Sequence, residues 1–107
     1  MSDERVNAIF SALADPTRRA VILALSESGP VTATTLAAEL PVTRQAVVKH
    51  LEALAEAGLA QAERSGKEMR YRLTPEPMTE AVRWMVGVGA EWDVRLEALR
   101  KHLGPSR

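Results

Sequence analysis

A short run of residues between positions 43 and 49 combines side chains that hydrogen-bond well to nucleobases and phosphates. Its members are Thr43, Arg44, Gln45, Val48 and Lys49. An arginine can donate two parallel hydrogen bonds to guanine, a glutamine amide can pair with adenine, and a valine can contact the methyl group of thymine. Threonine hydroxyl and lysine ammonium groups commonly hold phosphates. This run could therefore read one groove of a duplex, and the residue types leave open which side chain takes which role.

A second cluster of cations follows further along the chain. It consists of Arg64, Lys67, Arg70 and Arg72. Such a density of positive charge suits the phosphates beside a groove, or a narrow minor groove, although a basic hairpin on its own is more often a solvated loop. Residues 44–73 hold six Lys or Arg against four Glu, whereas residues 1–40 hold three Arg against five acidic residues. The positive charge is thus concentrated around the donor-bearing run, even though the formal net charge of the chain is zero.

Catalytic and metal-binding chemistry finds little support in the composition. The 107 residues include no cysteine, which removes disulfides, thiolate metal ligands and cysteine nucleophiles. The two histidines, His50 and His102, have no supporting cluster of carboxylates or nucleophiles in the sequence. His50 adjoins an apolar stripe, where a packed and hydrogen-bonded ring is the usual interpretation, and His102 suits a helix C-terminus. We therefore expect no enzymatic activity, no cofactor and no metal site.

Four short helices should position the donor-bearing run. They are expected at residues 4–13, 16–27, 32–40 and 43–57. Asp15 before Pro16 is a typical N-cap followed by a first-turn proline, and Thr32 and Thr43 can cap the next two helices in the same way. Gly58 suits the left-handed position after a helix end.

The fourth helix divides into two faces. Val47, Leu51 and Leu54 form one apolar stripe that belongs in the core. The donor-bearing run lies off this stripe and remains available for another purpose.

Beyond Gly58 the apolar period changes from helical to alternating, which predicts a β-hairpin of residues 59–64 and 69–74 with a basic tip. A single helix over residues 76–103 should follow, and about 28 residues span roughly 42 Å. Its apolar stripe is longer than so small a body can cover, so we expect a second copy of the chain to cover the remainder. The mid-helix glycines could mark a close helix crossing or a small cavity, and a small-molecule effector could enter near the tryptophans. The expected dimer interface comprises Phe10, Met78, Val82, Met85, Trp92, Leu96 and Leu99.

Three motifs together resemble the ArsR (arsenic-repressor-type) family of homodimeric repressors. They are LADPTR at residues 13–18, the pattern HLxxLxxxGL at residues 50–59, and the hairpin segment at residues 66–73. The resemblance is close over residues 4–75 and implies a fold in which the first and last helices form the dimer. Metal-sensing members carry cysteines on the third helix or an Asp/His set on the last. Here the third helix reads TTLAAEL and the last has only Asp93 and His102, so we expect a member without the metal-sensing sites.

The sequence therefore predicts a single α+β, mainly helical winged helix-turn-helix domain over residues 1–107, in the order of four helices, two strands and one helix. Residues 16–74 should form the DNA-binding core, with dimerisation helices at residues 4–14 and 76–103. The expected function is sequence-specific binding to double-stranded DNA, as a homodimeric transcriptional repressor of its own operon at a pseudo-palindromic operator. The alternative is a winged-helix protein-interaction module without DNA binding. Because the chain has neither a secretory signal nor an apolar run of about 18 residues, we expect a cytoplasmic protein.

Overall fold

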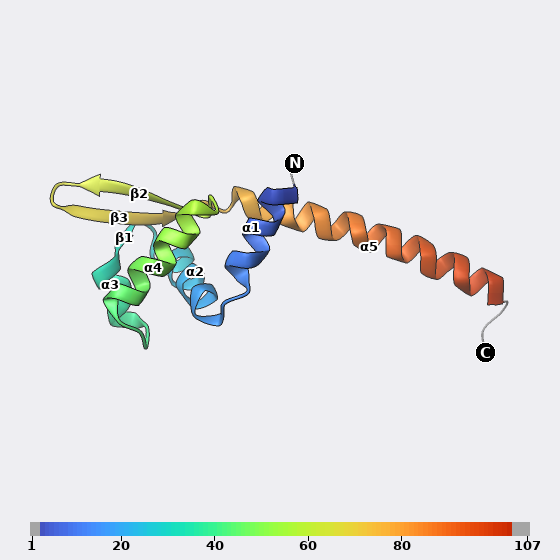
Figure 1. Cartoon of the computed structure of the whole chain (residues 1–107), viewed down its shortest axis with the longest axis horizontal. Coiled ribbons are helices and arrows are strands. Elements are labelled where there is room, and N and C mark those ends of the chain that lie inside the picture. The colour runs from blue at the N-terminus through green and yellow to red at the C-terminus, as the bar shows by residue number, and fades with distance from the viewer. Residues whose placement is uncertain (1–2, 104–107) are drawn as a thin grey trace.

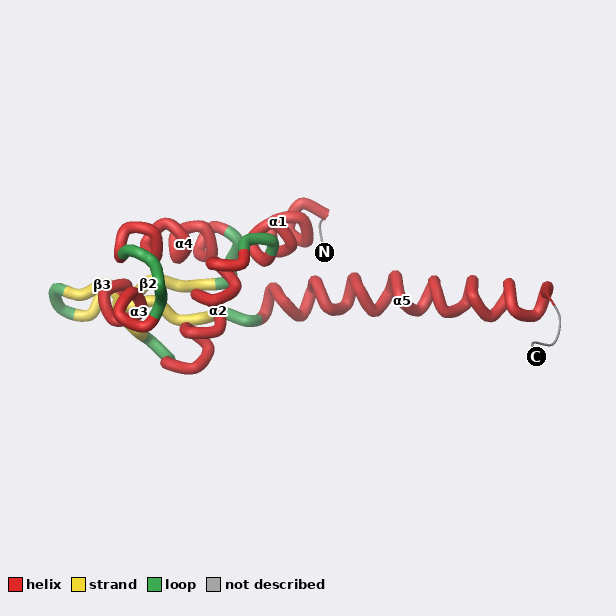
Figure 2. Tube along the Cα trace, turned by 90° about the horizontal axis from the view of Figure 1, so that it is seen from below, coloured by secondary structure: helices red, strands yellow, loops and turns green. Residues whose placement is uncertain are grey.

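A computed structural model describes residues 3–103 and shows a small body from which one long helix projects (Figure 1). The elements are α1 (Asp3–Leu13), α2 (Pro16–Ser28), β1 (Val31–Thr32), α3 (Ala33–Glu39), α4 (Arg44–Glu56), β2 (Ala60–Ser65), β3 (Glu68–Leu73) and α5 (Glu76–Leu103). The principal extents of the molecule are 67 × 28 × 19 Å, and both views show that α5 accounts for the longest one (Figure 2). The two ends of the expected domain, residues 1–2 and 104–107, lie outside the described residues.

The helix starts agree with the predicted caps. Asp15 Oδ1 accepts hydrogen bonds from the backbone N–H groups of Thr17 and Arg18, at 2.8 and 3.1 Å. The hydroxyl oxygens of Thr32 and Thr43 each accept from a backbone N–H three residues later, at 3.1 Å. Each cap satisfies an amide that the first helical turn leaves unpaired. The glycine predicted after α4 has φ 79°, a conformation that suits glycine at a helix end.

The wing contains one strand more than the sequence predicts. Val31 and Thr32 form β1, which pairs antiparallel with β3 and gives a three-stranded sheet of order β1-β3-β2. The expected hairpin is present, but Ser65 pairs with Glu68, so the connecting loop has two residues rather than the four predicted. Gly66, with φ 64°, supplies the positive φ that such a tight hairpin turn requires. The β1 pairing ties the start of α3 to the wing.

The core lies between α1, α2, α3, α4 and the base of the sheet. Val47, Leu51 and Leu54 of α4 are completely buried, as their helical spacing predicts. Around them pack apolar residues from each neighbouring element, including Ile9, Val21, Leu25, Leu36 and Leu59. Burial of side chains of this size is worth about 1.5–3 kcal/mol each, which fixes one face of α4 firmly against the body.

Within residues 3–103, only the first turns of α5 contact the other elements. Ala81 is buried against the core, and the Trp84 ring stands edge-on to Phe10 of α1, with centroids 5.7 Å apart. Arg5 Nε lies 2.8 Å from Glu80 Oε2. Beyond this region α5 extends freely from the body (Figure 1).

Candidate nucleic-acid interface

The exposed face of α4 gathers the donor-bearing residues that the sequence singles out. Arg44, Gln45 and Lys49 are exposed, and Val48 is half-buried beside them. These four line one surface hollow together with Glu52. Glu52 was not among the predicted site residues, although its position one helical turn beyond Val48 and Lys49 could have revealed it. A carboxylate on this face has the chemistry to accept from the amino group of cytosine and to repel phosphate.

Thr43 serves first as a helix cap. Its hydroxyl oxygen accepts from Ala46 N, which leaves the hydroxyl proton free to point outward. A threonine in this place can donate to a phosphate without releasing the helix end. The position of Thr43 immediately before α4 is therefore compatible with the predicted phosphate contact.

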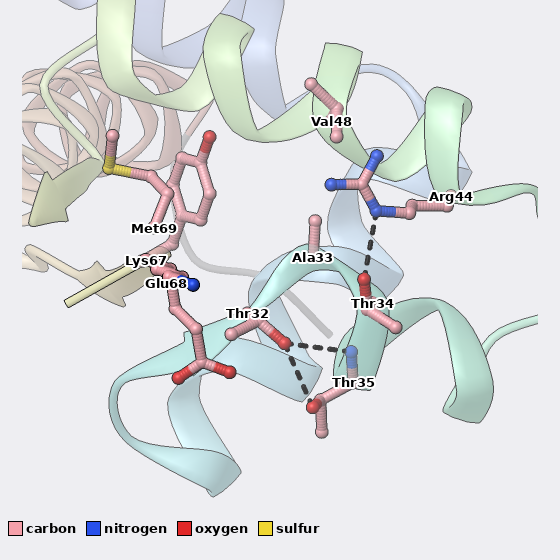
Figure 3. Close-up of a pocket in the computed structure, with 10 residues that line it drawn as sticks. Thr32, Ala33, Thr34, Thr35, Arg44, Val48, Lys67, Glu68 and Met69 are labelled. Atoms are coloured by element: carbon pink, nitrogen blue, oxygen red, sulfur yellow. Dashed lines mark hydrogen bonds between the residues drawn. The ribbon is translucent and has the colours of Figure 1, made fainter. Parts of the chain in front are cut away.

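A cleft of about 550 Å³ separates α3 and α4 from the wing (Figure 3). Arg44 enters it from α4, and Lys67 and Met69 line it from the hairpin. Arg44 Nε donates a hydrogen bond of 2.9 Å to the hydroxyl of Thr34 on α3. Thr34 was not predicted as a site residue, because ten positions separate it from Arg44 and no local pattern connects them.

The register of the wing separates the four predicted cations. Residues that pair across strands share one face of the sheet. Arg64 pairs with Met69, whereas Arg70 pairs with Glu63 and Arg72 with Gln61. Arg70 and Arg72 therefore share one face, Arg64 shares the other with Met69, and Lys67 lies in the two-residue turn. The cations that are close in sequence do not form a single patch.

Arg70 and Arg72, which share one face of the sheet, also have partners within the chain. Arg70 Nη2 lies 3.2 Å from Glu68 Oε1, and Arg72 donates to the side-chain oxygen of Gln61. These contacts are exposed and individually weak. They nevertheless reduce the positive field that Arg70 offers to a phosphate, because an anion is already beside it.

His50 joins α4 to the start of α2, as the expectation of a packed, hydrogen-bonded ring requires. Its Nδ1 accepts from Arg18 Nε at 3.3 Å. The nearby Asp15 carboxylate accepts backbone N–H groups from Arg18 and Thr17, and these bonds, helped by the positive charge of Arg18, hold the pKa of Asp15 below its ordinary value. The LADPTR and HL motifs thus contact each other through Arg18 and His50. This contact lies between the start of α2 and α4.

The residues predicted for the dimer fall into two groups. Phe10 and Met78 are half-buried within their own chain. Trp92 is 57% exposed and Leu99 is 53% exposed. The exposed group lies along one side of the projecting helix and comprises Val82, Met85, Trp92, Leu96 and Leu99.

Within residues 3–103 no three His, Cys, Asp or Glu side chains come together in a way that could hold a metal ion. None of the helices there has the length and apolar character needed to cross a membrane.

Known proteins share both the sequence and the architecture. A helix-turn-helix domain family matches residues 13–60. The chain is 40% identical over 78 residues to the uncharacterized HTH-type transcriptional regulator YuzN of Bacillus subtilis, covering 67% of this chain and 85% of that protein. It is 31% identical over 81 residues to the transcriptional repressor SdpR of the same organism, covering 76% and 89% respectively.

A solved structure extends the likeness to almost the whole chain. The ArsR-like transcriptional regulator from Rhodococcus sp. RHA1 superimposes with a TM-score of 0.83 at 38% identity, covering 97% of this chain and 96% of that one. The relatives are regulators rather than enzymes. From this likeness, the winged architecture and the exposed face of α4, we conclude that the chain belongs to the ArsR family of winged helix-turn-helix DNA-binding transcriptional regulators.

Proposed function

We propose that this protein is a homodimeric repressor that binds a pseudo-palindromic operator beside its own gene. The observation that carries the proposal is the division of α4 into two faces. Val47, Leu51 and Leu54 are fully buried, while the opposite face presents a guanidinium, an amide and an ammonium group. A helix fixed in this way can enter a major groove about 12 Å wide. The repressor SdpR among the relatives supports repression as the outcome of binding.

The wing flanks this helix and supplies contacts to the sugar-phosphate backbone of the DNA. Lys67 lines the cleft together with Arg44, so both charges can approach one duplex from the same side. Arg70 and Arg72 lie on the other face of the sheet and can reach a neighbouring phosphate or the minor groove. Contacts of this kind contribute affinity for any duplex, whereas the α4 side chains contribute the choice of sequence.

Salt titration of duplex binding tests this division of labour in the wing. We expect Lys67→Ala to weaken binding to operator and to random duplex alike. The logarithm of the association constant should also fall less steeply with the logarithm of salt concentration, by about 2 for the dimer, because each chain loses one phosphate contact. The matched variant Arg70→Ala removes the same charge from a position where the Glu68 carboxylate lies 3.2 Å away and partly offsets it, so its slope should change less. Equal slopes for wild type and both variants would contradict the assignment of the wing.

The exposed stripe of α5 supports a second copy as its partner. The stripe follows a repeating spacing of four and three residues that passes through Gly89, as Met78, Val82, Met85, Gly89, Trp92, Leu96, Leu99 and Leu103. Alternating spacing of this kind is the seam of a coiled coil, in which each large side chain enters a hole on the facing helix. A symmetric pair of chains would use the same stripe twice.

We propose that the two α5 helices run antiparallel, with the two-fold axis between Ala90 and Glu91. Each seam residue then meets a different one across the interface: Gly89 meets the partner's Trp92, Met85 meets the partner's Leu96, Val82 meets the partner's Leu99, and Met78 meets the partner's Leu103. A Cβ added at Gly89 would meet nothing within 4 Å in its own chain. A mid-helix glycine lowers helix stability by about 1 kcal/mol. Packing of the partner's indole into the space at Gly89 would offset this loss.

A parallel pair fits the same residues less well. Gly89 would then face its own copy and leave a void, and the two Trp92 rings would meet each other. Arg95 would also face the partner's Arg100, placing like charges together at both edges of the seam. The antiparallel arrangement avoids all three conflicts.

Cysteine cross-linking distinguishes the two arrangements, because the natural chain has no cysteine. We expect an equimolar mixture of the Val82→Cys and Leu99→Cys variants to form a disulfide-linked dimer. Each variant alone should remain uncross-linked, since seventeen residues along a helix separate the two copies of each cysteine by about 25 Å. Efficient cross-linking of Leu99→Cys by itself would indicate the parallel pair instead.

A further inference from the structure

Arg44 is held by a specific contact before any duplex is present. It is the first residue of α4 and is exposed, and a free arginine of this kind samples many rotamers. Its Nε donates to Thr34 Oγ1 at 2.9 Å, across the gap between the two helices of the helix-turn-helix (Figure 3). This bond selects a subset of those rotamers and directs the guanidinium along the cleft.

Thr34 is itself well anchored. The preceding residue, Ala33, is buried, and Thr32 pairs with Arg70 of the wing. The Thr32 hydroxyl also binds both the backbone N–H and the hydroxyl of Thr35, at 3.1 and 3.0 Å. The backbone around Thr34 is thus held on both sides, and a β-branched side chain has few χ1 rotamers, so the Thr34 hydroxyl can take few positions relative to α4.

The remaining donors of Arg44 are the ones that base recognition needs. A guanidinium has five N–H donors, and the contact with Thr34 uses the one on Nε. Among residues 3–103 no protein acceptor bonds either Nη atom of Arg44. The Nη1 and Nη2 pair therefore remains as a fork, which matches the O6 and N7 acceptors of guanine.

We propose that Thr34 is a positioning residue that orders Arg44 for one guanine in each half-site. This inference rests on the proposed function, because it requires that Arg44 reads a base. Thr34 does not touch the base. It lowers the entropy that Arg44 loses on binding. This gain counts only at the matching base pair, because only that pair fixes the guanidinium. Sequence preference at that position, rather than general affinity for DNA, should depend on the Thr34 hydroxyl.

The test begins with the wild-type protein and a duplex pool of randomised sequence, from which its preferred site is selected. The base pair read by Arg44 is the position at which Arg44→Ala loses discrimination. We expect Thr34→Val, which removes the hydroxyl and keeps the shape, to lower the preference for that base pair about five- to tenfold. Thr34→Ser keeps the hydroxyl and should retain the preference. The wild type, Thr34→Val and Thr34→Ser should have the same melting temperature, because Thr34 is exposed.

A double variant separates positioning from a direct contact. Once Arg44→Ala is present, Thr34→Val should cause no further loss. An equal loss on every duplex that persists without Arg44 would mean that the Thr34 hydroxyl binds the backbone itself, and would overturn the proposal. Unchanged preference in Thr34→Val, or failure of Thr34→Ser to retain it, would overturn it as well. A wild-type chain that selects no sequence would instead refute the proposed function on which the inference rests.

Discussion

Replacing Trp92 with alanine is expected to dissociate the dimer at micromolar concentration and to weaken operator binding at least 100-fold. Trp92 is 57% exposed in the single chain and is the largest side chain on the α5 seam. Truncating a packed tryptophan costs about 3–5 kcal/mol, and a symmetric interface incurs that loss twice. Each 1.4 kcal/mol changes an equilibrium constant tenfold.

Operator binding follows the dimer because two half-sites are engaged together. Two linked reading helices bind sites about 34 Å apart far more tightly than one helix binds a single site. Sedimentation should therefore report the monomer, and a titration with operator duplex should report the loss of affinity, although no DNA-facing residue has changed.

Val94 offers a matched control for the Trp92 variant. It lies on α5 close to Trp92 and is 69% exposed, but it falls outside the four-three seam. Val94→Ala should remain dimeric and bind as the wild type does. A Trp92→Ala protein that stays dimeric with normal affinity, or a wild type that sediments as a monomer, would contradict the proposed interface.

Replacing Arg44 with alanine should reduce the preference for operator over random duplex by at least about 30-fold. A good bidentate contact between arginine and guanine is worth about 1–3 kcal/mol of discrimination, and the dimer makes two of them. The measurement is a competition titration of labelled operator against random-sequence duplex at one salt concentration. Affinity for the random duplex should fall much less, because that duplex lacks the matching guanine at a defined position.

Arg83 provides the control for loss of charge. It is exposed on α5, away from α4 and from the apolar seam, so Arg83→Ala removes one positive charge without removing a reading group. Its ratio of operator to random binding should equal that of the wild type. If Arg44→Ala kept the same ratio, sequence recognition would have to lie elsewhere on α4.

Much of the fold follows from local chemistry, which a sequence expresses directly. The caps at Asp15, Thr32 and Thr43 and the turn at Gly58 depend on atoms within a few residues of one another, and they occur as predicted. The apolar stripe of α4 is equally local, because helical spacing alone decides which side chains share a face. The donor-bearing face of α4 could be predicted for that reason.

Contacts between segments far apart in the sequence could not be predicted from local patterns and are seen only in the tertiary structure. Val31 and Thr32 form a strand only because β3 lies beside them, and two residues carry too little pattern to predict one. The exact turn at Gly66 sets the pairing register, and a strand alternates its faces with every residue, so Arg64 is separated from Arg70 although the two are close in sequence.

The charge pattern and the helical periods of this protein were therefore determined by the sequence itself, since both depend on residues near one another along the chain. The hydrogen bond from Arg44 to Thr34 was decided by tertiary packing. It requires α3 to be placed by the wing and α4 to be placed by the core, and no spacing along the chain encodes the distance between two helices that are positioned by different neighbours.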